Sequence, residues 1–158
     1  MKITRLGLVL GLLIPTGFAM ADAIEEREGW VVRPTEKTYS ELVEAVKGAT
    51  HANQMGVVTE AGPTQAAAGR GITIPGNRVI GVFNNDFAVK ILNLSTAAMI
   101  EAPIRIYITE NPDETATLSY KSPSHVLGPY LDEGGQPLAD LAAALDDKFG
   151  QIADAAVK

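Results

Sequence analysis

The sequence predicts an α+β domain in which a mixed β-sheet has its helices packed on one face. Two observations carry this prediction. Residues 104–110 alternate between isoleucine and mostly polar side chains, and a second alternating run at 116–121 follows a turn at 111–113, which is the pattern of a β-hairpin. Apolar residues recur at helical spacing over 42–49 and again over 138–152, so strands and amphipathic helices share one chain.

The N-terminal part of the domain is predicted to form a strand, a helix and a second strand. Residues 29–33 are suited to a first strand, which we expect Pro34 to end. Thr38 and Glu41 have the spacing of a capping box, in which the threonine caps a helix and the glutamate reaches back to the cap. This helix ends near Asn53, and the short β-branched run MGVVTE that follows it is typical of a strand.

The middle of the chain combines a loose segment with a strand and a helix. Residues 61–76 are rich in glycine, proline and alanine and predict a loop with one helical turn at 64–68. The apolar run at 78–83 predicts a buried strand, and the sequence Asn-Asn-Asp at 84–86 offers N-caps for a helix. The apolar face predicted for this helix comprises Phe87, Ala88, Ile91 and Leu92.

The C-terminal part is predicted to be a connector and a long helix. Residues 124–135 contain a proline and three glycines and therefore predict a connector. Pro137 then stands in the first turn of a helix, where its missing N–H removes no hydrogen bond. Apolar side chains return every three or four residues as far as Ile152, so we expect this helix to dock on one face of the sheet.

The first 21 residues have the pattern of a cleavable secretory signal. Lys2 and Arg5 supply a positive start, residues 6–18 are apolar and uncharged, and Ala-Met-Ala at 19–21 matches a small-x-small cleavage site. The apolar run is shorter than the roughly 20 residues that cross a bilayer. We therefore expect a mature domain of residues 22–158, periplasmic or secreted, with no membrane association after the signal is removed.

Charge and cysteine content exclude several classes of function. The formal net charge is −6, and removal of the signal takes away Lys2 and Arg5 and leaves −8. An acidic surface repels phosphate backbones, so we expect no nucleic-acid partner. The sequence contains no cysteine, which excludes disulfides, thiol catalysis and thiolate metal sites.

Three segments resemble the domain of unknown function 302 family. They are NRVIGVFNN at 77–85, APIRIY at 102–107 and LSYKSP at 118–123. The resemblance extends from about Tyr39 to Ile152, and it implies a β-α-β(4)-α fold without an established activity. Many members of this family place a cysteine after the proline that opens the hairpin. Here an isoleucine follows that proline, so a thiol role is absent from this chain.

Polar side chains at the ends of the predicted strands form the candidate site. Side chains converge where the chain leaves a sheet, so we expect a ligand pocket there. Its predicted residues are Asn84, Glu101, Arg105, Tyr120 and His125. Most of them also have a structural interpretation. Asn84 suits a helix cap, Glu101 and Arg105 can pair with each other, and His125 can be a surface residue beside a turn.

Three classes of function are compatible with these residues. The favoured interpretation is a non-catalytic module that binds a small ligand or a protein partner. The alternatives are a metal- or haem-associated protein that uses a histidine, and a small enzyme that uses His125 with Glu101 or Tyr120. No stretch carries a catalytic, metal or cofactor signature, so none is assigned. The ligand's identity, and the choice between a monomer and a homodimer, are left open.

Overall fold

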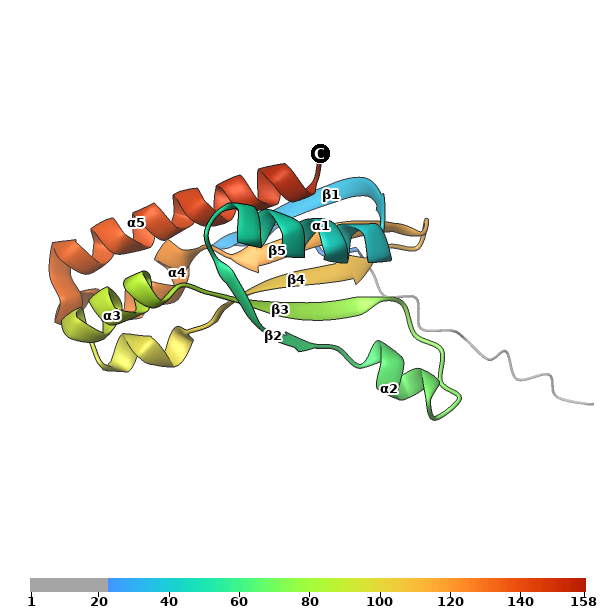
Figure 1. The fold of residues 1–158 in the computed structure, drawn as a ribbon, viewed down its shortest axis with the longest axis horizontal. Helices are drawn as coiled ribbons and strands as arrows, with labels where there is room; N and C mark the ends of the chain where they lie inside the picture. The colour runs from blue at the N-terminus through green and yellow to red at the C-terminus, as the bar shows by residue number, and fades with distance from the viewer. Residues whose placement is uncertain (1–22) are drawn as a thin grey trace, which may run out of the picture.

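The protein is built on a five-stranded sheet in the order β1-β5-β4-β3-β2, with α1 and α5 lying side by side across one face (Figure 1). A computed structural model describes residues 23–158, so the predicted signal lies outside the described residues. The strands are β1 (Trp30–Thr38), β2 (Gly56–Ala61), β3 (Asn77–Phe83), β4 (Ile104–Glu110) and β5 (Thr115–Lys121). The helices are α1 (Tyr39–Ala52), α2 (Thr64–Ala68), α3 (Asn85–Leu94), α4 (Pro123–Leu127) and α5 (Leu131–Ala156), with 3-10 turns η1 (Ala97–Glu101) and η2 (Gly128–Tyr130).

The α+β class is confirmed, but the sheet is antiparallel throughout and not mixed. Each neighbouring pair, β1 with β5, β5 with β4, β4 with β3 and β3 with β2, is antiparallel. The β1-α1-β2 unit does return its second strand in the direction of the first. The other three strands lie between β1 and β2, however, so the two parallel strands never become neighbours.

The core lies between the sheet and the two long helices. Ile104, Ile106 and Ile108 point toward the helices and are at most 9% exposed, which confirms the predicted isoleucine row. Against them pack apolar side chains of both helices, namely Leu42, Val46, Leu138, Leu145, Phe149 and Ile152. The capping box of α1 is also confirmed. The Thr38 hydroxyl accepts from the Glu41 amide, and the Glu41 carboxylate accepts from the Thr38 amide at 2.9 Å.

Two boundaries differ from the sequence prediction for identifiable reasons. β1 continues past Pro34 to Thr38, because it is an edge strand in which a missing N–H removes no ladder bond. The register against β5 shifts between Pro34 and Thr38. The predicted connector at 124–135 is largely helical. It contains α4, η2 and the start of α5, which is interrupted at Gly135, where φ is 59° and ψ is −154°.

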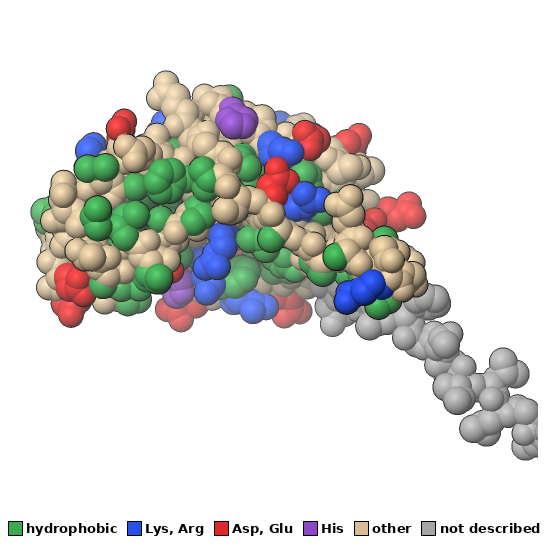
Figure 2. All heavy atoms as spheres, turned by 60° about the horizontal axis from the view of Figure 1, so that its bottom comes forward, with side chains coloured by type: hydrophobic (Ala, Val, Ile, Leu, Met, Phe, Trp, Pro, Cys, Tyr) green, Lys and Arg blue, Asp and Glu red, His purple; other side chains and the backbone are tan. Residues whose placement is uncertain are grey.

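The end of the molecule formed by α3 and η1 exposes hydrophobic side chains (Figure 2). Leu92 is exposed, although the sequence analysis placed it on the buried face of its helix. The helix instead packs through Ala88 and Ile91, and a residue next to Ile91 points about 100° away around the helix. Ile100, in η1, is 80% exposed.

Candidate functional site

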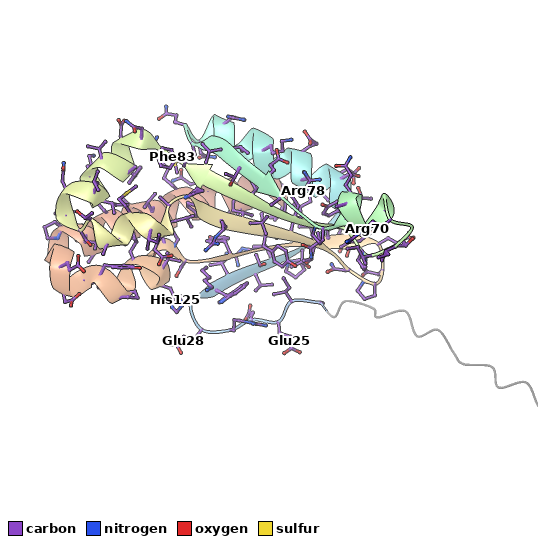
Figure 3. The ribbon with its side chains drawn as sticks, turned by 90° about the horizontal axis from the view of Figure 1, so that it is seen from below. Glu25, Glu28, Arg70, Arg78, Phe83 and His125 are labelled. Atoms are coloured by element: carbon purple, nitrogen blue, oxygen red, sulfur yellow. The ribbon has the colours of Figure 1, made fainter. Side chains whose placement is uncertain are left out.

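The face of the sheet opposite α1 and α5 carries the candidate site (Figure 3). Strand register orders the side chains of this face in rows that cross the sheet. One row contains Val79, Tyr107 and Ser119, which are partners across β3, β4 and β5. The next row toward the end of β5 contains Lys121, which is paired with Trp30, and Arg105 on the adjoining strand. Aromatic, apolar and cationic groups are thus brought together from four strands.

A groove of about 510 Å³ lies over these rows. This size falls in the range of small-molecule sites, which are typically apolar clefts with a few convergent polar groups. Its lining residues are Trp30, Asn77, Val79, Glu101, Ile104, Arg105, Tyr107, Tyr120, Lys121 and Val126. The apolar body and the polar rim of such a site are therefore both present.

Arg105 and Lys121 are the two cations that line the groove. Both side chains are exposed, and neither forms an ion pair with any residue in the range 23–158. Glu101 lines the groove as well, but one of its carboxylate oxygens accepts a hydrogen bond from the Tyr130 hydroxyl at 2.8 Å. Two cations and one carboxylate therefore give the groove a net charge of +1.

Trp30 stands at one side of the groove in contact with two cations. The Arg27 guanidinium carbon lies 5.1 Å from the centroid of its ring, and the Lys121 Nζ lies 5.8 Å from it. Both distances are within the range of a cation–π interaction, about 6 Å. The indole thus helps to hold the Lys121 ammonium at the groove.

Two further polar groups lie on this face. The Asn77 amide donates a hydrogen bond to the Tyr107 hydroxyl, which fixes the phenol at the end of the groove. The Ser119 hydroxyl, in the same row as Tyr107, is fully buried and has no hydrogen-bond partner among the described residues. An unpaired buried hydroxyl costs free energy, so this face holds a polar group that the chain itself does not use.

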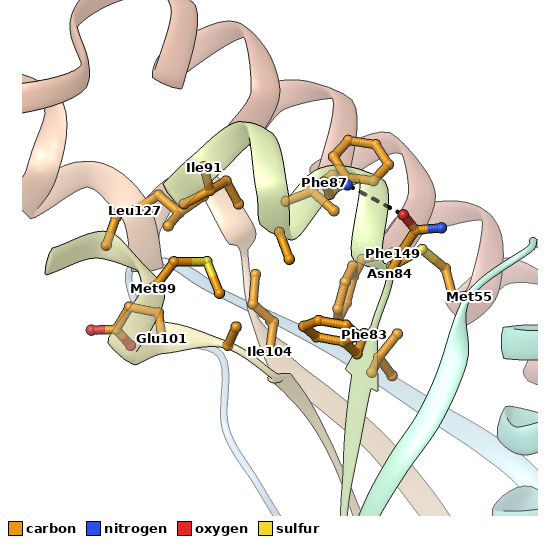
Figure 4. A pocket seen from close by; sticks show the side chains of 15 residues that line it. Met55, Phe83, Asn84, Phe87, Ile91, Met99, Glu101, Ile104, Leu127 and Phe149 are labelled. Carbon is orange, nitrogen blue, oxygen red and sulfur yellow. Dashed lines mark hydrogen bonds between the residues drawn. The ribbon is translucent and has the colours of Figure 1, made fainter. Parts of the chain in front are cut away.

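A second, smaller cavity lies where β3 ends, beneath α3 (Figure 4). Its volume is about 30 Å³, and its lining is apolar except for Asn84 and Glu101. Side chains of Phe83, Met99 and Ile104 surround it, together with Met55, Phe87, Ile91, Leu127 and Phe149. Glu101 and Ile104 border both cavities, so the chain between these two residues forms a shared wall.

The structure brings some of the predicted site residues together and separates others. Glu101 and Arg105 both line the groove, but they form no ion pair with each other, and Glu101 accepts a hydrogen bond from Tyr130. Asn84 lies at the small apolar cavity. Its side-chain oxygen caps α3 by accepting from the amides of Asp86 and Phe87, which confirms its interpretation as a cap.

Of the remaining two predicted residues, Tyr120 is among the residues that line the groove and His125 is not. The Tyr120 side chain is 4% exposed and points toward the helices, where its ring centroid lies 5.5 Å from that of Phe149. Burial raises the pKa of this phenol. His125 lies on α4 against Gly29, at the start of β1, while Phe83 lies across the sheet from it (Figure 3). His125 lines neither of the two cavities.

Four aromatic or polar residues of the groove were not predicted from the sequence, namely Trp30, Asn77, Tyr107 and Lys121, nor were the apolar Val79, Ile104 and Val126. Two of the four could have been found. The alternation that was recognised in the hairpin puts Tyr107 on the face of Arg105, and Lys121 on the face opposite Tyr120. Trp30 and Asn77 reach the site only through pairing between distant parts of the chain, for which the sequence carries no local signal.

Over residues 23–158, no three His, Asp or Glu side chains are grouped as ligands for a metal ion. Over the same residues, no helix is both long and apolar enough to cross a membrane.

An antiparallel sheet with helices on one face and a groove on the other defines an α+β domain with an open sheet surface. Residues 31–156 match the family described as domain of unknown function DUF302, and the chain belongs to that family. It is similar in fold to a solved structure, the uncharacterized conserved protein DUF302 from Bacillus stearothermophilus. The TM-score is 0.72 at 15% sequence identity, with 84% of this chain and 100% of that one covered. No curated protein sequence matches it significantly.

Proposed function

We propose that this protein is an exported, non-catalytic binding module, and that the groove on the helix-free face of the sheet is its ligand site. The observation that carries the proposal is the composition of the groove. Side chains of β1, β3, β4 and β5 converge on a space of about 510 Å³ that combines an apolar body with Arg105, Lys121 and Glu101. Such convergence of a few polar groups on an apolar cleft is typical of small-ligand sites.

The position of the histidine favours binding over catalysis. A general base must reach the bound substrate within hydrogen-bond distance. The His125 imidazole packs against Gly29 outside the groove, and the Tyr120 phenol points into the core on the other side of the sheet. The groups that do line the groove, a guanidinium, an ammonium and aromatic rings, are suited to holding a ligand.

Native mass spectrometry of the exported protein, purified from its own host, tests the proposal. We expect a species heavier than the bare chain by the mass of a small organic molecule. Val79→Trp places a large ring in the groove and should abolish that species, because Val79 lines it. Val89→Trp, at an exposed position on α3, is the matched control and should retain it. A bare wild-type protein, or a ligand still retained by Val79→Trp, would overturn the proposal.

A further inference from the structure

The groove contains a pair of like charges, neither of which has an ion-pair partner among the described residues. Arg105 directly precedes Ile106, and Lys121 directly follows Tyr120, and Ile106 and Tyr120 are the partners at the end of the β4–β5 ladder. The two cations therefore occupy the same level of adjacent strands, on the same face of the sheet. Like charges directly opposite each other across two strands destabilise a sheet. Their side-by-side placement thus lowers the stability of the sheet, and the fold gives no structural reason for it.

No acidic side chain of the described residues forms an ion pair with either cation. The ion pairs among residues 23–158 link Lys47 to Glu44 and Glu60, and Arg78 to Glu60, away from the groove. Glu101, the acid that lines the groove, accepts a hydrogen bond from Tyr130 and offsets one of the two positive charges, so the groove has a net charge of +1. The exposed glutamates on the segment before β1 are outside ion-pair distance of both cations. They are Glu25, Glu26 and Glu28.

The surroundings of the two cations are aromatic and apolar. Trp30, Tyr107 and Val79 flank them within the groove, and Trp30 lies within cation–π distance of Lys121. An anion bound there would meet two positive charges beside low-dielectric walls, where charge-assisted hydrogen bonds are stronger than in water. The whole chain carries a net charge of −6, so a positive groove contrasts in sign with the protein that contains it.

We infer that the ligand of this groove is a small organic anion, with a carboxylate or equivalent group held between Arg105 and Lys121 and a flat apolar body against Trp30 and Tyr107. This inference rests on the proposed function and names the ligand class of the same site. The two cations would then be partners for the ligand, which explains why the fold leaves them without one.

Benzoate, benzamide and benzamidine test the inference, because they share one planar shape and differ in charge. Each is titrated into the exported protein and followed by NMR, using the indole N–H resonance of Trp30, the only tryptophan. We expect benzoate to bind at least about tenfold more tightly than benzamide, since a charge-assisted hydrogen bond contributes that much. Benzamidine should not bind. Equal affinity for benzoate and benzamide would overturn the inference that the ligand is an anion. It would leave the proposal that the groove binds a ligand intact.

Variants of the two cations test whether Arg105 and Lys121 bind the carboxylate of benzoate. Arg105→Gln and Lys121→Gln should each weaken benzoate binding several-fold and leave benzamide binding unchanged. Lys90→Gln, which removes an exposed cation from α3, is the control and should change neither. Failure of benzoate to perturb the Trp30 resonance, or unchanged affinity in both groove variants, would also overturn the inference. Native mass spectrometry decides separately whether the groove holds a ligand at all, so the two proposals fail independently.

Discussion

The Tyr130 hydroxyl donates a hydrogen bond to the Glu101 carboxylate at 2.8 Å, which joins η2 to the wall between the groove and the small apolar cavity. The bond holds the one acid of the groove against η2. Glu101 forms no ion pair with Arg105, although only three residues separate them in the sequence. The hydrogen bond from Tyr130 therefore fixes the position of the one carboxylate that lines the groove.

The hydrogen bond to Glu101 raises the pKa of Tyr130. The carboxylate accepts a hydrogen bond from the neutral phenol, whereas a phenolate would lose this bond and be repelled by the carboxylate. A difference absorbance titration between the wild type and Tyr130→Phe isolates this phenol from the other three tyrosines. We expect it to titrate above the usual range of tyrosine. In a Glu101→Gln background the same difference titration should shift to lower pH. An identical curve in both backgrounds would show that the bond does not form in solution.

Ile106 lies at the centre of the sheet, where it is fully buried between its partners and the helices. Ile106→Ala should lower the free energy of unfolding by about 2–5 kcal/mol, as lost burial and a residual cavity both contribute. Val89→Ala, at a position 48% exposed, removes a similar group from the surface and should cost far less. Urea denaturation measures both. A loss under about 1 kcal/mol for Ile106→Ala would contradict this face assignment.

Local patterns predicted much of the fold, and long-range pairing accounts for what they missed. The Thr38–Glu41 capping box and the 104–121 hairpin involve neighbours in the sequence, so spacing alone identifies them. The antiparallel order of the sheet was missed because it depends on which distant strands pair. Pro34 was assigned as a strand end for the same reason, since an edge position becomes known only from the strand order.

The candidate site was predicted in part. Glu101 and Arg105 were found because they flank the start of a recognisable strand, and both line the groove. Tyr120 was included for its position near a strand end. It is the cross-strand partner of Ile106, however, so its side chain points to the same face as Ile106 and its ring lies in the core. Trp30 was missed, because it reaches the groove only through the pairing of β1 with β5.

Glu60, on β2, connects Lys47 of α1 and Arg78 of β3, at 3.2 and 2.9 Å. Partial burial acts to raise the pKa of this carboxyl, but the hydrogen bonds and charges of the two cations outweigh it and hold the pKa below its usual range. A carboxyl with a depressed pKa stabilises the fold above its unfolded pKa of about 4.3, and this contribution is lost as the pH falls through the folded pKa.

Glu60→Gln should therefore lower stability at neutral pH and flatten its decline on acidification. The loss at neutral pH should stay below about 1 kcal/mol, because all three side chains are partly exposed. Urea denaturation across the acidic range measures the effect. Glu36→Gln, at an exposed position without an ion pair among the described residues, is the control and should leave the acid profile unchanged. Identical profiles for the two variants would contradict the assigned role of Glu60.

The N-terminal segment predicts where the mature chain begins. Because Ala-Met-Ala at 19–21 follows an uncharged apolar run, cleavage should fall between Ala21 and Asp22. N-terminal sequencing of the protein from the periplasmic or secreted fraction should therefore begin at Asp22. Substitution of Ala21 by a bulky residue such as Trp should block cleavage and retain the precursor in the membrane fraction. Wild-type protein that begins at Met1 would contradict export by a cleaved signal.

The contact between Gly29 and His125 can be tested by measuring how substitution of Gly29 changes the free energy of unfolding. Gly29 has a φ of +73°, and a Cβ atom on it would lie 2.2 Å from Cγ of the His125 imidazole. Gly29→Ala should therefore destabilise the protein through two effects, the positive φ and the clash with the ring. Gly71 has a φ of +74° with no heavy atom within 4 Å of the same position, so Gly71→Ala isolates the first effect, at about 1–2 kcal/mol.

A double-mutant cycle between Gly29→Ala and His125→Ala separates the clash from the backbone strain. His125 is exposed on α4, so His125→Ala alone should change stability little. In that background the clash is absent, and the cost of Gly29→Ala should fall to about that of Gly71→Ala. The coupling between the two sites should be of the order of 0.5–3 kcal/mol, the range for residues in contact. Urea denaturation of the four proteins measures it. If Gly29→Ala costs the same with and without the imidazole, His125 does not pack against Gly29, and its exclusion from the groove loses its structural basis.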